Sequence, residues 1–192
     1  MRRNGLGIIT TALVVLVLSG CSMFAQANGV ILYGEEEEIA KAVEKEKDKA
    51  KEEEQHEIKI FTEDNRQIMI LTEETTQSLI KKKLIKEITN QEKATTKAIS
   101  SLPSVSKGEA LLFTKEESHE LGIDNVNISY EGNLVIGDGR TYADKFLIVN
   151  NDDWNSFGGT KKTMAILKYD KDPSANGLRY DVEKTQLVRI QD

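Results

Sequence analysis

Four short apolar runs, each followed directly by a polar residue and acidic side chains, constrain the fold more than any other feature of this chain. They are VILYGEE, IMILTEE, ALLFTKEE and FLIVNNDD, which begin at residues 30, 68, 110 and 146. A short apolar run suits a buried strand, whereas a small polar residue followed by acidic ones is typical of a helix N-terminus. The pattern predicts one strand-to-helix connection used four times. We therefore expect an α+β fold, in which one mixed sheet carries two longer helices and one or two short helices.

Two long segments are rich in helix-forming residues. Residues 35–55 contain no Gly or Pro and begin with a run of glutamates, which suit the N-terminal end of a helix dipole. We predict a helix over Glu35–Gln55 whose first half packs and whose second half is solvated. The alternative is a charged docking arm for a partner. In residues 73–99, apolar positions recur at spacings of four or seven, which predicts a second helix.

Hairpins and short connections account for the rest of the chain. The alternating stretch 58–72, with the turn residues EDNR at its centre, predicts a hairpin, and a second hairpin is expected at 126–137 around EGN. The remaining expected elements, in chain order, are a buried strand over 30–33, a short helix over 115–122 capped by Thr114 with Glu117, a buried strand over 145–149, a helical turn over 150–157, and final strands over 162–170 and 178–191.

The N-terminal sequence MRRNGLGIITTALVVLVLSGC has three parts in the order of a secretory signal peptide. Two arginines give a positive start, residues 6–18 form an apolar core, and Ser19 and Gly20 supply small residues. A membrane-spanning helix needs about 20 predominantly apolar residues, so this run is short for a permanent span. We therefore interpret residues 1–20 as a signal peptide.

The four residues LSGC at positions 18–21 resemble the lipobox of bacterial lipoproteins. The resemblance covers only the N-terminal region up to Cys21. It implies that a diacylglycerol is attached to the sulfur of Cys21 and that the signal peptide is cut just before this residue. The organisation that follows is a signal peptide at 1–20, a lipidated tether at 21–28 and a single α+β domain at 29–192.

Lipidation of Cys21 would use the only cysteine in the chain, so the fold would contain no disulfide. Two acyl chains hold a protein stably at a membrane, because each buried methylene contributes about 0.8 kcal/mol. We therefore expect the protein at the cell membrane, lipid-anchored on the extracytoplasmic face. The alternative is that Cys21 is incidental and that the signal peptide is cut after Ala25 or Ala27.

The chain is acidic, which bears on its partners. Removal of residues 1–20 takes away two arginines and changes the formal net charge from −6 to −8. Nucleic-acid phosphates select for Lys and Arg, and so do anionic lipid surfaces. The composition argues against nucleic acid as a partner and against broad electrostatic contact with anionic lipid. An unknown protein partner stays open.

The sequence contains none of the common catalytic or cofactor motifs. The spacings G-x-S-x-G, H-E-x-x-H, C-x-x-C and the P-loop are all absent. His56 and His119 lie in or beside charged segments, where we expect surface positions. We therefore predict no enzyme activity and no cofactor.

One stretch has the composition of a calcium loop. In DKDPSANG, oxygen-bearing side chains alternate at Asp170, Asp172, Ser174 and Asn176, as calcium ligands do. The positions of the glycine and of the twelfth residue do not match an EF-hand loop. The alternative is a turn between strands, which favours Asp, Pro and Asn for backbone reasons.

Three residues are candidates for ligand or partner binding. Gly137 and Gly139 in GDGRTYADKF would let a ligand approach the backbone, with Arg140 and Tyr142 beside it. The alternative is a loop that uses glycine for positive φ. Trp154, the only tryptophan, is the third candidate, because tryptophan is enriched at binding hot spots. Its alternative role is to anchor the core beneath a short helix.

The function that we predict is a membrane-anchored extracytoplasmic lipoprotein that binds a partner without catalysing a reaction. In size and character the chain resembles small, uncharacterised surface lipoproteins of Gram-positive bacteria. Two alternatives stay open. One is an accessory or sensing subunit of a membrane transporter or kinase, and the other is a carboxylate-dependent hydrolase of envelope material, which needs two carboxyl groups with separated pKa values in one cleft.

Anchoring can be tested by changing Cys21. In cells given labelled fatty acid, the wild-type chain should carry label, whereas Cys21→Ala should carry none and should accumulate as an uncut precursor or a shed form. Equal labelling of the two chains would contradict lipidation at this residue.

Overall fold

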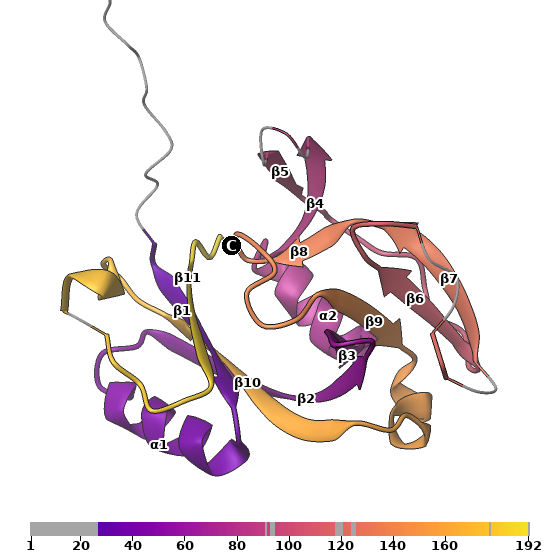
Figure 1. Ribbon diagram of the computed structural model, residues 1–192. Coiled ribbons are helices and arrows are strands. Elements are labelled where there is room, and N and C mark those ends of the chain that lie inside the picture. Colours follow the sequence, from indigo (N-terminus) through magenta and orange to yellow (C-terminus); the bar gives the residue numbers. More distant parts are fainter. Residues whose placement is uncertain are drawn as a thin grey trace, which may run out of the picture.

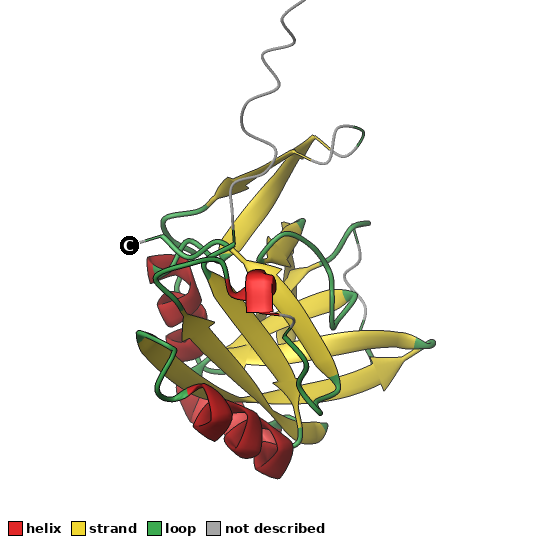
Figure 2. Cartoon of the chain, turned by 90° about the vertical axis from the view of Figure 1, so that its left-hand side faces the viewer, coloured by secondary structure: helices red, strands yellow, loops and turns green. Residues whose placement is uncertain are grey.

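The structure, a computed structural model, describes residues 27–90, 92, 95–117, 121–123, 126–176 and 178–191. These residues form two sheets, with helices on their faces (Figures 1 and 2). The predicted signal peptide, Cys21 and most of the predicted tether lie outside the described residues. Within the described part of the chain, no helix is both long and apolar enough to cross a membrane.

The main sheet is open and mixed, with strand order β11-β1-β10-β2-β3-β9-β6-β7. Its neighbouring strands are antiparallel except for the parallel pairs β3–β9 and β6–β7. The strands are β1 (Gly29–Gly34), β2 (Glu52–Glu63), β3 (Arg66–Thr72), β6 (Glu109–Phe113), β7 (Asn127–Gly132), β9 (Lys145–Val149), β10 (Thr160–Lys168) and β11 (Lys184–Val188).

A small antiparallel sheet and four helical segments complete the structure. The small sheet has strand order β5-β4-β8, with β4 at Ile85–Asn90, β5 at Thr95–Ala98 and β8 at Leu134–Ile136. The helical segments are α1 (Glu36–Glu46), α2 (Glu73–Lys81) and two 3-10 turns, η1 (Asn151–Ser156) and η2 (Pro173–Asn176). The predicted mixed sheet is confirmed, but strands dominate and the expected balance of helix and sheet is wrong.

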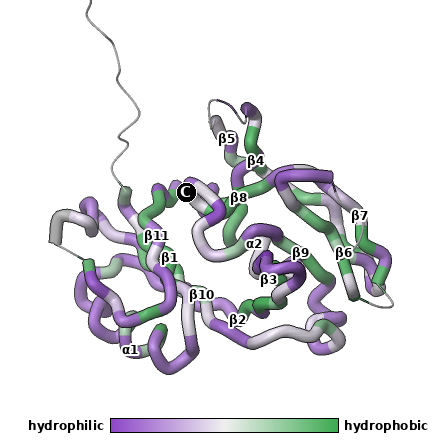
Figure 3. The backbone as a smooth tube through the Cα atoms, viewed as in Figure 1, coloured by the Kyte–Doolittle hydropathy of each residue, from purple (hydrophilic) through white to green (hydrophobic). Residues whose placement is uncertain are grey.

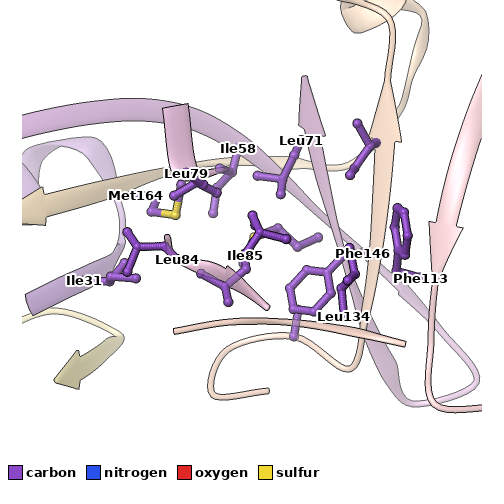
Figure 4. Close-up of a cluster of buried hydrophobic side chains, with 14 of the residues drawn as sticks. Ile31, Ile58, Leu71, Leu79, Leu84, Ile85, Phe113, Leu134, Phe146 and Met164 are labelled. Atoms are coloured by element: carbon purple, nitrogen blue, oxygen red, sulfur yellow. The ribbon is translucent and has the colours of Figure 1, made fainter. Parts of the chain in front are cut away.

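The core lies on both faces of the main sheet, because successive side chains of a strand point to opposite faces. In β1, Ile31 and Tyr33 join the largest apolar cluster, which α2 and the small sheet cover, while Val30 and Leu32 join the cluster under α1. Figure 4 shows part of the largest cluster. A third cluster lies on the face of the main sheet towards η1 and includes Phe157. Figure 3 shows hydrophobic colour along β1 and β9 and mainly hydrophilic colour along α1.

Three of the four predicted strand-to-helix connections are confirmed, namely β1–α1, β3–α2 and β9–η1. The side chain of Thr72 caps α2 by accepting from the Thr75 N–H at 3.1 Å, and that of Asn150 accepts from the Asp152 N–H at 2.9 Å at the start of η1. The fourth is wrong, since the described residues of 115–122 are not helical.

The hairpin predicted around EDNR is confirmed as β2–β3. Glu63 pairs with Arg66 across a two-residue turn. Asp64 and Asn65 in this turn have φ values of 48° and 60°. Two positive φ values are those of a type I′ turn, whose twist matches that of the two strands.

The predicted helix Glu35–Gln55 is wrong in its second half. α1 ends at Glu46, and the following residues form β2. The Lys51 N–H donates to the Lys168 carbonyl at 2.7 Å, where an antiparallel ladder between β2 and β10 begins. Helix propensities differ by only a few tenths of a kcal/mol among these residues. The hydrogen-bonding groups of β10, which need a partner inside the sheet, therefore decide the conformation.

The predicted second helix over 73–99 is also too long. Lys83 has a φ of 58°, in the left-handed region, and the N–H groups of Lys83 and Leu84 donate to the carbonyls of Ile80 and Leu79, both at 2.9 Å. This pair of bonds is a Schellman motif, which ends a helix. The residues that follow form the hairpin β4–β5 instead.

The hairpin predicted at 126–137 is wrong because its two strands belong to different sheets. β7 pairs with β6 in the main sheet, whereas β8 pairs with β4 in the small one. The chain changes sheet at Gly132, whose φ of 112° few other residues tolerate. Sequence alternation marks a strand but does not identify its partner.

The charges at the start of β2, which was predicted to be helical, lead to a prediction about stability. Glu52 lies 3.1 Å from Lys168 Nζ, and Glu54 lies 3.4 Å from Lys82 Nζ, whereas Glu53 forms no ion pair among the described residues. Both lysine side chains are mostly buried. The double variant Glu52→Lys/Glu54→Lys should therefore lower the free energy of unfolding by about 2 kcal/mol.

Glu53→Lys is the matched control, because its side chain has no charged partner among the described residues and points to the other side of the strand. We expect this change to alter the free energy of unfolding by less than about 0.5 kcal/mol. Urea denaturation measures both effects. Equal losses in the two variants would contradict the register of β2 on β10.

Candidate functional site

A cavity of about 460 Å³ lies between the small sheet and the segment that follows β8. We call it the Arg140 cavity. Ile88 of β4 and Val135 of β8 give it apolar walls, and Thr96 of β5 borders it from the hairpin. Its other lining residues are polar or charged, namely Glu92, Lys115, Asn133, Asp138 and Arg140, together with Gly139.

Glycine at position 137 sets the path of the segment beside the cavity. Gly137 has a φ of 65°, and its N–H donates to the Leu84 carbonyl at 2.8 Å. A Cβ atom there would lie 2.6 Å from both Gln186 Nε2 and Val188 Cγ1, closer than packed atoms come. Only glycine suits both the backbone and the space, so the chain turns here and carries Arg140 to the cavity.

Arg140 is held at the cavity by a single hydrogen bond within the described part of the chain. Its Nη2 donates to Asn133 Oδ1 at 2.7 Å, and its guanidinium carbon lies 5.6 Å from the centre of the Phe146 ring. Nε and Nη1 are buried and have no hydrogen-bond partner there. Burial lowers the pKa of Arg140, although Asp144 and Tyr130 act in the opposite direction. The guanidinium nevertheless stays charged, because its ordinary pKa lies far above neutrality.

The carboxylates near Arg140 are occupied by other groups. Asp138 Oδ1 lies 2.6 Å from Lys86 Nζ, and Asp144 Oδ2 accepts from the Gln67 N–H at 2.9 Å. No described carboxylate forms an ion pair with Arg140. The cavity therefore combines apolar walls with a cation whose hydrogen bonding is incomplete.

The structure does not bring Tyr142 to the cavity with Arg140. The Tyr142 ring stacks on Tyr33, with ring centres 4.6 Å apart and planes 14° apart. Its hydroxyl donates to Glu183, which also accepts from Lys162. Burial and the Glu183 carboxylate raise the pKa of Tyr142. Tyr142 thus joins a network that fixes β11 to the sheet.

Trp154 lies in η1, at a third location. Its Nε1 donates to Glu57 Oε1 at 2.8 Å, and its ring lies 4.5 Å from Lys59 Nζ. Lys59 is buried and donates to the carbonyls of Trp154 and Phe157, both at 2.7 Å. The tryptophan covers a buried lysine and packs beside the third apolar cluster. These contacts are those of a residue that anchors η1 to the sheet.

A polar cleft of about 410 Å³ lies where the start of α1 approaches β2 and β10. Two of its carboxylates are paired: Glu35 binds Lys162, and Glu57 lies 3.1 Å from Lys161 Nζ. The hydrogen bond from Trp154 lowers the pKa of Glu57, with Lys161 contributing in the same direction. Glu57 is therefore ionised at neutral pH. A carboxylate hydrolase requires one carboxyl with a raised pKa as proton donor, and Glu57 has the opposite shift.

The calcium candidate has the contacts of a turn. Asp172 Oδ1 accepts from the Ser174 N–H at 2.8 Å and from its hydroxyl at 2.6 Å, and these bonds lower the pKa of Asp172. Asp170 lies 3.5 Å from Lys51 Nζ. The side chain of Asn176 lies outside the described residues. Within the described part, no group of three or more His, Cys, Asp or Glu side chains could hold a metal ion.

His56 is not a surface residue as predicted. Its side chain is only 14% exposed and its Nε2 lies 3.6 Å from Glu54 Oε2. The error follows from the wrong helix, because a position directly after a predicted solvated helix lies instead on an inner strand, β2. His119 lies outside the described residues.

The sequence indicated Arg140 but missed Ile88, Thr96 and Asn133, which help to form the cavity. Ile88 and Thr96 were assigned to the second helix. The β-branched stretches before and after NQEKA could have indicated a hairpin here, because such residues favour strands.

Comparison with known proteins gives two likenesses. Residues 27–191 match the sequence model of an "Uncharacterised lipoprotein family". The fold is similar to the crystal structure of a "Putative Lipoprotein from Bacillus anthracis", with a TM-score of 0.77 and 26% sequence identity over 86% of this chain and 100% of that chain. The search of curated proteins finds no match.

The position of His56 generates a pH prediction. Burial lowers the pKa of His56; Glu54 and Glu74 oppose this effect, and Lys82 adds to it. The folded chain binds this proton less readily than the unfolded chain, whose His pKa is about 6.5. Stability should therefore be complete above about pH 6.5 and should fall as the pH decreases below this value.

His56→Gln should weaken that dependence, because glutamine does not titrate. Melting temperatures of both chains between about pH 5 and 8 measure the effect. The Glu54 carboxyl, whose lowered pKa lies below its ordinary value of 4.5, titrates outside this window. An equal slope in the two chains would contradict the assignment to His56.

Proposed function

Because the chain belongs to the uncharacterised lipoprotein family, we propose that it is a lipid-anchored binding protein without catalytic activity, and that the Arg140 cavity is its ligand site. The family match and the Bacillus anthracis likeness confirm the bacterial lipoprotein predicted from LSGC. A lipoprotein is associated with a membrane. The attachment at Cys21 and the extracytoplasmic face are part of the proposal, as are the signal peptide at 1–20, the tether at 21–28 and the single domain at 29–192.

The tether keeps the binding domain close to the membrane. Gly29, where β1 begins, follows Cys21 by eight residues, which span at most about 28 Å when extended. The β4–β5 hairpin, which borders the Arg140 cavity, projects from the end of the molecule at which β1 begins (Figures 1 and 2). A ligand bound there would lie near the membrane surface.

One observation carries the assignment of the site: the cavity joins apolar walls to the incompletely bonded Arg140. Its volume of about 460 Å³ lies within the range of small-molecule pockets. Ligand pockets are commonly apolar with a small number of polar groups that orient the ligand. Ile88 and Val135 supply the apolar contacts, and Arg140 supplies the polar group that orients the ligand.

Binding without catalysis is the reading that the polar cleft supports. Its Glu35 and Glu57 carboxylates are bound to lysines, and the pKa of Glu57 is lowered. Glu57, with its lowered pKa, can hold a charged partner but is no proton donor at neutral pH. Within the described residues, no specific contact favours a transporter subunit over a free-standing binding protein.

Blocking the cavity tests the proposal. The chain of the Bacillus anthracis structure is matched in full by 86% of this chain, so residues 27–192 are sufficient for an equilibrium study. The neutral fluorophore N-phenyl-1-naphthylamine serves as an apolar probe. Thr96→Trp places a large ring at the border of the cavity and should weaken binding of the probe at least about tenfold.

Lys97→Trp is the matched control, because Lys97 is exposed, is adjacent on β5 and does not line the cavity. Its affinity for the probe should equal that of the wild-type chain. Fluorescence titration measures all three chains. No binding by the wild type, or equal binding by both tryptophan variants, would contradict the site.

A further inference from the structure

Most buried cations of this protein are paired, and Arg140 differs from them. Six lysines whose side chains are mostly buried have charged or carbonyl partners within 4 Å: Lys59 with the Trp154 and Phe157 carbonyls, Lys82 with Glu52 and Glu54, Lys86 with Asp138, Lys145 with Glu63, Lys162 with Glu35 and Glu183, and Lys168 with Glu52. Among the described residues, Arg140 hydrogen-bonds only to the neutral side chain of Asn133, and Asp144 acts on it electrostatically without forming an ion pair.

This difference matters because a cation removed from water is stable only when other groups replace its lost hydration. Two guanidinium nitrogens of Arg140, Nε and Nη1, are buried without a hydrogen-bond acceptor in the described part of the chain. The guanidinium carbon lies 5.6 Å from the centre of the Phe146 ring, which supplies a weak cation–π contact but no acceptor. An anionic acceptor suits a guanidinium better than a neutral one, because charge-assisted hydrogen bonds are stronger.

We propose that the ligand of the Arg140 cavity is an amphiphilic acid, with an apolar body and one anionic head group. This inference rests on the proposed function and adds the ligand class. The anionic head binds the guanidinium of Arg140 through charge-assisted hydrogen bonds. The apolar body lies against Ile88 and Val135, which line the same cavity. Carboxylate, sulfonate and phosphate head groups share this chemistry.

The charges around the cavity are consistent with one anionic group. Lys86 neutralises Asp138, which leaves the carboxylate of Glu92 to be weighed against Lys115 and Arg140. Lys86 does not itself line the cavity, and the four charged lining residues, Glu92, Asp138, Lys115 and Arg140, sum to zero within a chain whose total formal charge is −6. The cavity therefore repels an anion less than the acidic protein as a whole does, and Lys86 beside it adds a positive charge.

A pair of fluorophores of similar shape tests the class of ligand. 1-Anilinonaphthalene-8-sulfonate carries one sulfonate, and N-phenyl-1-naphthylamine has the same aromatic body without a charge. The wild-type residues 27–192 should bind the sulfonate at least about tenfold more tightly than the neutral probe, because a hydrogen bond to a charged group adds that much. Equal affinities would overturn the inference while leaving the proposed binding site intact.

Arg140→Met removes the charge and keeps an apolar stem over Phe146. It should abolish the preference for the sulfonate but retain the neutral probe within about threefold. Lys97→Met, which removes an exposed charge next to the cavity, should keep the preference. Loss of the preference in both variants would mean that it arises from general charge, and retention in Arg140→Met would show that Arg140 does not bind the anion.

A competition experiment without any substitution guards against misfolding of the arginine variant. Decanoate should displace the sulfonate probe from the wild-type chain, whereas decanol should displace it at least about tenfold less well. Sedimentation with phosphatidylglycerol vesicles, compared with phosphatidylcholine vesicles, distinguishes an anionic lipid from a free acid as the source. Equal displacement by decanoate and decanol, without preferential sedimentation on the anionic vesicles, overturns the proposal.

Discussion

The antiparallel pairing of β2 with β10 is the interaction on which the rest of the structure depends. It runs from Thr160 opposite Ile60 to Lys168 opposite Glu52. On one side of this pair lie β1 and β11, and on the other lie β3, β9, β6 and β7. Without it the main sheet would separate into two parts that share no backbone hydrogen bonds. The acidic segment after α1 is extended because this pairing requires it.

The same pairing places charged groups where they need partners. Glu52 and Glu54 point towards Lys168 and Lys82, and the mostly buried His56 follows on the same face. A half-buried charge without a partner is costly. The acidic composition that suggested a solvated helix is therefore used, in this part of the chain, to neutralise lysines inside the fold. Arg140 is the exception that gives the structure a candidate ligand site.

The small sheet gives the cavity its shape. It forms because α2 ends at Lys81, Lys83 takes the left-handed conformation, and the chain continues as the β4–β5 hairpin, against which β8 pairs. The segment after β8 then turns at Gly137 and brings Arg140 to the cavity. A single helix over 73–99 would contain no such cavity, because Ile88 and Thr96 would lie on the helix surface. The error in secondary structure and the missed site thus have one cause.

Features that depend on neighbouring residues could be predicted from the sequence. The turn at Asp64 and Asn65, the cap at Thr72 and the cap at Asn150 each involve atoms within three residues of one another, so residue type alone specifies them. The lipoprotein class was readable for the same reason, because LSGC and the apolar run before it form one continuous stretch.

Tertiary structure alone decided whether the ambiguous segments, the second half of 35–55 and the later part of 73–99, form helix or strand. Lys168 and Glu52, which meet across β10 and β2, are 116 positions apart, and no local pattern records such a pairing. The helix and strand propensities of the acidic segment differ by a smaller free energy than β10 gains from its hydrogen bonds. The burial of His56, the pairing of β8 with β4 and the position of Arg140 all follow from distant contacts. The sequence by itself determined the anchor motif, the local caps and the turn, whereas long-range pairing determined the sheets and the cavity between them.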